Sequence, residues 1–279
     1  MASAVQALAA ATDALAAAGC DSARLDAELL LAEATGLDRT ELIARPETGV
    51  DGPAARCFGA MVRRRLVREP VAYILGRKGF RRIELAVDSR VLVPRPETEL
   101  LVEVALELEP AAVLDVGTGS GAIALAVADE LAGVEVVATD TSHDALAVAK
   151  WNAERLRLAG RVRFEYGSVP AAVGDAPAEF DLVLANLPYV SEGEWPLLAP
   201  EILRHEPREA LVPGPTGLEA IERLLGAVAA GELRTRAMAL EVGESQALTV
   251  GGLMRRAGFE RVEIRSDLAG LKRVVVGHR

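Results

Sequence analysis

Cysteine and histidine are scarce in this sequence, and neither forms a recognisable pattern. The two cysteines, Cys20 and Cys57, lie far apart and fit neither a disulfide framework nor a zinc motif, so we expect both to be buried or half-buried thiols. The three histidines, His143, His205 and His278, show no metal-ligand spacing. The sequence therefore predicts no metal site.

Long apolar runs are absent as well. Hydrophobic residues make up 51% of the 279 residues, which permits a full core in one large and one small domain. Every apolar run nevertheless ends well short of the length that spans a bilayer. The Ala-rich start has no basic segment before an apolar run, and Asp13 interrupts it. We therefore expect a cytoplasmic protein without a signal peptide, a transmembrane helix or a membrane partner.

An excess of basic residues is also missing. The chain has 31 Lys and Arg against 41 Asp and Glu, which gives a net charge of −10. Because basic surface supplies most of the affinity for nucleic-acid phosphates, this balance disfavours a stable nucleic-acid partner, although local basic patches stay possible. We interpret one such cluster as solvated helix surface, with partner contact as the alternative. It comprises Arg63, Arg64, Arg65 and Arg68.

Residues 1–73 have the composition of a helical domain. Leu25, Leu29 and Ala32 follow i, i+4, i+7 spacing and predict one buried helical stripe, with Gly36 just past the helix end. A further helix is expected from about residue 54 to 68. We therefore expect residues 1–73 to form a small helical domain at the start of the chain.

Residues 74–95 change to near-alternation of apolar and polar positions, which is typical of strands. The apolar positions are Phe80, Ile83, Leu85, Val87, Val91 and Val93. Asp88 and Ser89 between them are turn residues. We predict a β-hairpin that links the helical domain to a second domain at 96–279.

From residue 96 onwards, strand and helix patterns alternate, which indicates a parallel sheet. Strands are expected at 113–116, 134–138, 162–164, 181–184 and 238–242, with an antiparallel pair at 262–264 and 274–276. Helices are expected at 100–108, 122–131, 143–158, 218–230 and 246–257. The fold class is therefore α/β, with a Rossmann-like seven-stranded sheet.

A glycine-rich turn follows the first of these strands. It contains Asp115, Gly117, Thr118, Gly119, Ser120 and Gly121. The glycines permit a tight turn and a close approach of a ligand to the backbone. Their alternate spacing differs from the dinucleotide fingerprint, but a preceding strand and a following helix favour a cofactor site.

Asp140 ends the second strand about twenty residues further on and is placed to accept hydrogen bonds from two ribose hydroxyls, next to Thr141. Its alternative role is to cap the helix that begins near His143. Asp115 beside the glycine turn would repel a pyrophosphate but attract a sulfonium or an ammonium. Charge therefore favours S-adenosylmethionine over NAD.

The strand at 181–184 ends in Asn186, Leu187, Pro188 and Tyr189. Ligands of open α/β sheets bind beyond the carboxyl ends of the strands, where these residues lie. Pro188 favours an extended Leu187, so the Leu187 carbonyl and the Asn186 side-chain oxygen can face one cleft. Two neighbouring acceptors suit a planar NH2 group, as in a carboxamide or adenine. An ordinary turn after a strand is the alternative.

Together these motifs resemble class I S-adenosylmethionine-dependent methyltransferases, and more narrowly the glutamine methyltransferases of peptide chain release factors (the PrmC/HemK family). The closer resemblance lies in residues 70–76, 91–99, 205–211 and 267–274, with Pro94-Arg95-Pro96-Glu97-Thr98 as its most specific element. It covers essentially the whole chain.

The resemblance implies methyl transfer from S-adenosylmethionine to the side-chain amide of the glutamine in a release factor's Gly-Gly-Gln motif. It implies release factors as partners and a substrate-recognition role for the helical domain at 1–73. We expect Arg95 and Glu97 to lie at the mouth of the cleft and to position substrate or cofactor, with an ion pair and a helix start as the alternative. Separately, we expect the enzyme to be a monomer. Leu187 stands where the family has proline. Ser168, followed by Val169, stands where the family has an acid that holds the adenine amino group, so we expect Ser168 to accept that hydrogen bond instead.

Two other functions stay open at this point. An adenine-specific RNA or DNA methyltransferase would use the same acceptor pair, and Asn-Leu-Pro-Tyr also resembles the motif of ribosomal-RNA adenine dimethyltransferases. A non-catalytic cofactor-binding protein is the second alternative, although it predicts a degraded acceptor motif, whereas Asn186, Pro188 and Tyr189 are intact.

Overall fold

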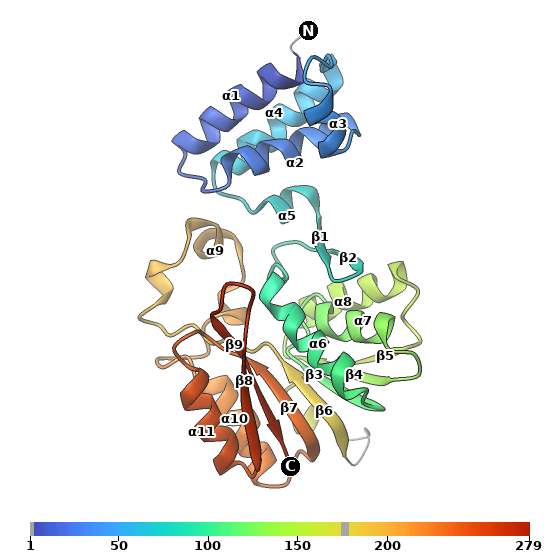
Figure 1. Cartoon of the computed structure of the whole chain (residues 1–279), viewed down its shortest axis with the longest axis vertical. Helices are drawn as coiled ribbons and strands as arrows, with labels where there is room; N and C mark the ends of the chain where they lie inside the picture. Colours follow the sequence, from blue (N-terminus) through green and yellow to red (C-terminus); the bar gives the residue numbers. More distant parts are fainter. Residues whose placement is uncertain (1–2, 174–178) are drawn as a thin grey trace. The chain divides into compact units, whose positions relative to one another are not determined.

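The computed structural model describes residues 3–173 and 179–279, and the chain divides into two compact units (Figure 1). The first unit comprises Met1–Arg77 together with Ala199–His205. The second comprises Lys78–Leu198 and Glu206–Arg279. Within the described ranges, no helix has both the length and the apolar character needed to span a membrane.

The first unit is helical. Its helices are α1 (Ala4–Ala17), α2 (Ala23–Thr35), α3 (Arg39–Ala44), α4 (Gly52–Leu66), α5 (Val71–Leu75) and the later α9 (Pro200–His205). The apolar side chains of α1 to α5 form one core, which includes Leu8, Leu15, Leu30, Leu31, Leu42 and Phe58. Gly36 ends α2 in the left-handed conformation, as its position in the sequence predicts.

The buried stripe predicted for α2 is wrong in phase. Leu25 is 42% exposed, whereas Ala27, Leu30 and Leu31 are buried. The same helix also buries Asp26, which pairs with Arg65, and Glu28, which pairs with arginines on α2 and α3. Paired carboxylates thus occupy part of the buried side of α2. A prediction from the spacing of apolar residues alone therefore does not identify that side.

The arginine cluster at the end of α4 and just after it is only partly solvated. Arg65 and Arg68 are buried, and both pair with Glu201 of α9, at N–O distances of 2.8 and 2.7 Å. Removing one partner of a buried pair leaves an uncompensated charge, so these pairs attach α9 firmly to the helical unit. Cys57, expected to be at least half-buried, is exposed, whereas Cys20 is buried.

A short hairpin, β1 (Arg77–Phe80) and β2 (Ile83–Ala86), begins at the boundary of the second unit. It turns at Arg81, earlier than the expected Asp88–Ser89 turn. Residues 91–93 form no strand, because the Val91 N–H donates to the Asp88 carbonyl and the Val93 N–H to the Glu206 carboxylate. These side-chain and turn contacts replace the ladder that alternation predicted.

The second unit is built on a seven-stranded sheet of order β5-β4-β3-β6-β7-β9-β8. Its strands are β3 (Ala112–Val116), β4 (Glu135–Asp140), β5 (Val162–Tyr166), β6 (Phe180–Ala185), β7 (Thr235–Glu241), β8 (Arg261–Ser266) and β9 (Lys272–His278). The first five pair in parallel, and β9 pairs antiparallel with β7 and β8. This confirms the predicted α/β sheet and its terminal antiparallel pair.

Helices cover both faces of this sheet. α6 (Glu99–Leu108), α7 (Ala122–Glu130) and α8 (His143–Arg155) lie on one face, and α10 (Glu219–Ala229) and α11 (Ala247–Arg256) on the other (Figure 1). The connections β3-α7-β4 and β4-α8-β5 run in one direction along the sheet, and right-handed crossovers therefore place both helices on the same face. The chain then returns past β3 to β6, so the strand order reverses between these two strands.

One buried amide joins the hairpin to the glycine-rich turn. Asn152 of α8 has no exposed surface, its Oδ1 accepts from the Ala86 N–H at 2.7 Å, and its Nδ2 donates to the carbonyls of Ala86 and Ser120. These bonds satisfy three backbone groups in the core.

We predict that Asn152→Ala lowers the free energy of unfolding by about 3 kcal/mol, because three buried polar groups lose their partner. Urea unfolding measures this change. Lys150→Ala, on the exposed side of the same helix, is the control and should stay within about 0.5 kcal/mol of the parent. Equal stability of the two variants would contradict the role of Asn152.

Candidate active site

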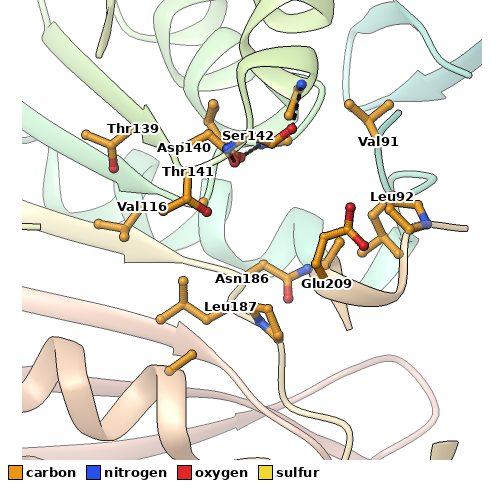
Figure 2. Close-up of a pocket in the computed structure, with 18 of the residues that line it drawn as sticks. Val91, Leu92, Val116, Thr139, Asp140, Thr141, Ser142, Asn186, Leu187 and Glu209 are labelled. Carbon is orange, nitrogen blue, oxygen red and sulfur yellow. Dashed lines mark hydrogen bonds between the residues drawn. The ribbon is translucent and has the colours of Figure 1, made fainter. Parts of the chain in front are cut away.

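A cavity of about 460 Å³ lies at the carboxyl ends of the parallel strands, within the second unit. Its walls come from the segments that follow β3, β4, β5 and β6, together with residues 90–98 and 207–213. Figure 2 shows Thr139 to Ser142 on one wall and Asn186 and Leu187 on another. This is the place where the strand order reverses, where open α/β sheets bind their ligands.

Most backbone N–H groups of the glycine-rich turn donate hydrogen bonds to other groups of the protein. Those of Gly117 and Thr118 donate to the Thr139 carbonyl, and that of Gly119 donates to Asp140 Oδ2 at 2.9 Å. All three glycines of the turn have φ values between 56° and 85°, and a Cβ on Gly121 would lie 2.8 Å from Leu125. Because these N–H groups are occupied, the turn is a poor cradle for phosphates.

Asp140 lies on the cavity wall with both oxygens engaged by the backbone. Oδ2 accepts from Gly119 and Oδ1 from the Ser142 N–H. Burial raises the pKa of this carboxyl, and the backbone hydrogen bonds oppose the rise. Ser142 caps α8 by accepting from the Ala145 N–H, so Asp140 is not needed as its cap. Its remaining lone pairs can accept from a ligand's hydroxyls.

Asp115 differs from the expectation, because it is fully buried and is not part of the cavity wall. Its Oδ2 accepts from the Thr118 hydroxyl and the Ala124 N–H, which holds the turn against the start of α7. Burial raises its pKa to about 7. The other oxygen, Oδ1, has no protein partner among the described residues.

Asn186, Leu187 and Pro188 all line the cavity, as the strand-end argument predicts. Ala185 of β6 pairs with Leu240 of β7, so Asn186 and Glu241 occupy matching positions at the two strand ends. Asn186 Nδ2 donates to the Thr98 hydroxyl at 3.0 Å, and that hydroxyl donates to Glu241 Oε2 at 2.6 Å.

Tyr189 is not among the residues that line this cavity. Its hydroxyl lies 3.3 Å from Glu241 Oε1, and its carbonyl accepts from Gln246 Nε2. Burial, with the neighbouring Glu241 charge, raises its pKa. The ring therefore supports the end of β7 rather than the cavity surface. Burial also raises the pKa of Glu241 to about 7, against the hydrogen bonds from Thr98 and Tyr189.

The two charged residues of the Pro-Arg-Pro-Glu-Thr segment have different places. Arg95 lines the cavity and pairs with Glu206 at 2.5 Å, and Glu206 also accepts from the Val93 N–H. Glu97 lies in the first turn before α6 and does not line the cavity. The contacts of Arg95 are thus those of an ion pair, and Glu97 occupies a position at a helix start where an acidic residue is favourable.

At the end of β5, Ser168 and Val169 line the cavity together with Gly167. The predicted cofactor residues Gly117, Thr118, Gly119, Ser120 and Thr141 line it as well, but Gly121 does not. Sequence reasoning missed Thr98 and Glu241. Thr98 could have been singled out from its motif, whereas Glu241 has no local signal, since it ends an ordinary buried strand.

Comparison with known proteins assigns the family. Residues 6–76 match the PrmC N-terminal domain and residues 96–217 the methyltransferase small domain. The release factor glutamine methyltransferase of Caulobacter vibrioides is 39% identical over 98% of this chain and 95% of its own length, and that of Cereibacter sphaeroides is 41% identical over 98% and 97%. This chain belongs to the release factor glutamine methyltransferase family.

Solved methyltransferase structures share the fold of this family member. The catalytic domain of human METTL16, solved with an RNA hairpin, superposes with a TM-score of 0.56 at 15% identity over 70% of this chain and 74% of its own. A methyltransferase from Pyrococcus furiosus superposes with a TM-score of 0.51 at 18% identity over 70% and 87%. The sheet is therefore that of a methyltransferase, and S-adenosylmethionine is the cofactor of this family.

The buried Glu241 predicts a pH dependence of stability. Its pKa is about 7 in the folded protein against an ordinary value of 4.5, so between these values the folded state binds a proton that the unfolded chain has lost. The free energy of unfolding therefore falls as pH rises through this window, by up to about 3 kcal/mol from this group.

We predict that Glu241→Gln reduces the fall in the free energy of unfolding between pH 5 and pH 8, measured by urea unfolding. Repeating the series in 0.5 M salt is the control, since salt screens exposed charges far more than buried ones. An identical fall in variant and parent would show that Glu241 does not titrate in this range.

Proposed function

We propose that this chain transfers a methyl group from S-adenosylmethionine to the side-chain amide nitrogen of a glutamine in peptide chain release factors, the glutamine of their Gly-Gly-Gln motif. The observation that carries the proposal is the near full-length identity to release factor glutamine methyltransferases. Three residues of the proposed acceptor motif, Asn186, Leu187 and Pro188, line the cavity.

The residues around the cavity fit the cofactor. Asp140 offers free lone pairs for the two ribose hydroxyls, and the occupied N–H groups of Gly117, Thr118 and Gly119 disfavour a phosphate-bearing ligand. Asp140 and Asp115 also favour a cation in this region. When bound, S-adenosylmethionine supplies a methyl group on a positively charged sulfur. Ser168 and Val169 are proposed for the adenine end, with Gly121 shaping the turn.

The proposed task of Asn186 and Leu187 is to hold the substrate amide. An amide nitrogen is a weak nucleophile because its lone pair is delocalised into the carbonyl. Asn186 Oδ1 and the Leu187 carbonyl would accept its two N–H groups and so fix the direction in which the nitrogen faces. Positioning of this kind can contribute several kcal/mol to a reaction. Pro188 limits the backbone freedom of Leu187, and Arg95, fixed by Glu206, would orient the substrate.

We further propose that the enzyme is a cytoplasmic monomer, and that the helical domain at residues 1–73 recognises the release factor. The net charge of −10 supports the absence of a stable nucleic-acid partner. Salt-sensitive binding to RNA would count against this.

The function is tested by mixing the purified protein, cofactor with a labelled methyl group, and either a release factor or its Gly-Gly-Gln variant with Gln replaced by Ala. Label should enter the first protein and not the second. An RNA hairpin and a DNA duplex with unpaired adenines test the adenine alternative. Labelled nucleic acid with an unlabelled release factor would overturn the proposal.

We predict that Asn186→Ala lowers kcat for release factor methylation by about a hundredfold or more, because a half-buried, oriented acceptor worth about 3 kcal/mol in the transition state is lost. The Kd of S-adenosylmethionine, measured by calorimetry, should change less than about threefold. Near-normal kcat would remove Asn186 from the mechanism.

Asp140→Ala should show the opposite pattern. It removes the acceptors proposed for the ribose, so the Kd of S-adenosylmethionine should rise at least about tenfold, in line with the loss of a hydrogen bond to a charged group. At saturating cofactor, kcat should recover most of its parental value. An unchanged Kd would show that Asp140 serves only the glycine turn.

A further inference from the structure

A chain of three buried or half-buried hydrogen bonds ends on the side-chain amide of Asn186. Asn186 Nδ2 donates to Thr98 Oγ1, Thr98 Oγ1 donates to Glu241 Oε2, and the Tyr189 hydroxyl donates to Glu241 Oε1. Thr98 and Glu241 are 4% and 2% exposed, so water does not compete for these contacts. We call Thr98, Glu241 and Tyr189 the relay.

The relay determines which way the Asn186 amide faces. The oxygen and nitrogen of an amide are nearly equal in size, so only the partners distinguish the two orientations. A carboxylate can only accept, and Thr98 has a single hydroxyl proton, which it therefore gives to Glu241. Thr98 is left with lone pairs alone, and these require a donor. Asn186 must present its NH2 group to Thr98.

The consequence lies on the other side of the amide. With Nδ2 held by Thr98, Oδ1 is the atom left for the cavity that Asn186 lines. A substrate NH2 group needs an acceptor there, and a flipped amide would present two donors to it and repel it. We propose that Thr98 and Glu241 are positioning residues that keep the Asn186 oxygen turned toward the substrate amide. This rests on the proposed function, because it concerns the same acceptor.

The relay also explains residues that the cavity itself leaves without a task. Thr98 comes from the Pro-Arg-Pro-Glu-Thr segment, whose two charged members pair or lie outside the cavity wall. Tyr189 does not line the cavity, and its hydroxyl contacts the second oxygen of Glu241. Both ends of the Asn-Leu-Pro-Tyr motif are therefore connected to the carboxyl group of Glu241 at the end of β7. Asn186 reaches it through Thr98, and Tyr189 contacts it directly.

Charge on Glu241 is not required for this orientation. A protonated carboxyl, or the amide of Gln, still offers one oxygen to Thr98 if its donor faces the Tyr189 hydroxyl, which can accept instead. What the relay needs is an acceptor for the Thr98 proton. Glu241→Leu removes that acceptor, and Thr98→Val removes the hydroxyl with little change in shape.

The test measures kcat and KM on a release factor for Thr98→Val and Thr98→Ser. Thr98→Val should lower kcat at least about tenfold, the effect of one lost hydrogen bond with a buried partner, with the KM of S-adenosylmethionine within about twofold. Thr98→Ser should restore most of the rate. Thr235→Val, which removes a buried hydroxyl at the other end of β7, is the matched control and should leave kcat unchanged.

A double-mutant cycle separates positioning from a loss of fold. If Thr98 acts through Asn186, Thr98→Val should have less than about a twofold effect in an Asn186→Ala background. Glu241→Gln should retain at least about a third of the rate, and Glu241→Leu should resemble Thr98→Val. Thermal unfolding and cofactor binding check that each variant is folded.

The outcomes distinguish the two proposals. A parent enzyme that labels no release factor overturns the proposed function. A parent that labels it while Thr98→Val keeps the parental kcat overturns the relay and leaves the function standing. Equal losses for Thr98→Val with and without Asn186 would assign Thr98 a structural role only and would likewise overturn the relay.

Discussion

The reversal of strand order between β3 and β6 is the constraint on which the site depends. Because the chain first runs outward from β3 and then returns to its other side, no crossover helix covers the carboxyl ends of these two strands. The glycine turn follows one of them and Asn186 the other. Cofactor residues and acceptor residues, about seventy positions apart in sequence, therefore face one cavity as a result of topology alone.

Carboxyl groups give this cavity its chemical character. Asp140 takes the Gly119 N–H that a phosphate-binding loop would keep free, and the buried Asp115 holds the start of α7. Burial raises the pKa of both, so the region favours a cation without requiring two full negative charges close together. A sulfonium cofactor fits this balance, and a pyrophosphate does not.

A segment of the chain that follows the acceptor motif belongs structurally to the helical unit. α9 lies there because Arg65 and Arg68 both pair with Glu201, which is 133 positions from Arg68 in sequence. Glu206, just after α9, pairs with Arg95 in the second unit. Ion pairs thus fix the stretch between the acceptor motif and α10 at Glu201 and at Glu206. Removing either partner of such a pair would leave the other charge uncompensated, which costs free energy.

Local patterns in the sequence were enough to locate the strands of the seven-stranded sheet, the glycine turn, Asp140 and Asn186, because each location depends on residues close together and on backbone geometry that glycine and proline report directly. The buried side of α2, the turn at Arg81, the burial of Arg65 and Arg68, and the relay from Thr98 to Glu241 were decided only by tertiary structure. For α2, the two arginines and the relay, a polar group is buried together with a partner elsewhere in the chain, 143 positions away for Thr98 and Glu241. Spacing and composition carry no record of such a partner, since the free energy that holds the pair arises only when folding removes both groups from water.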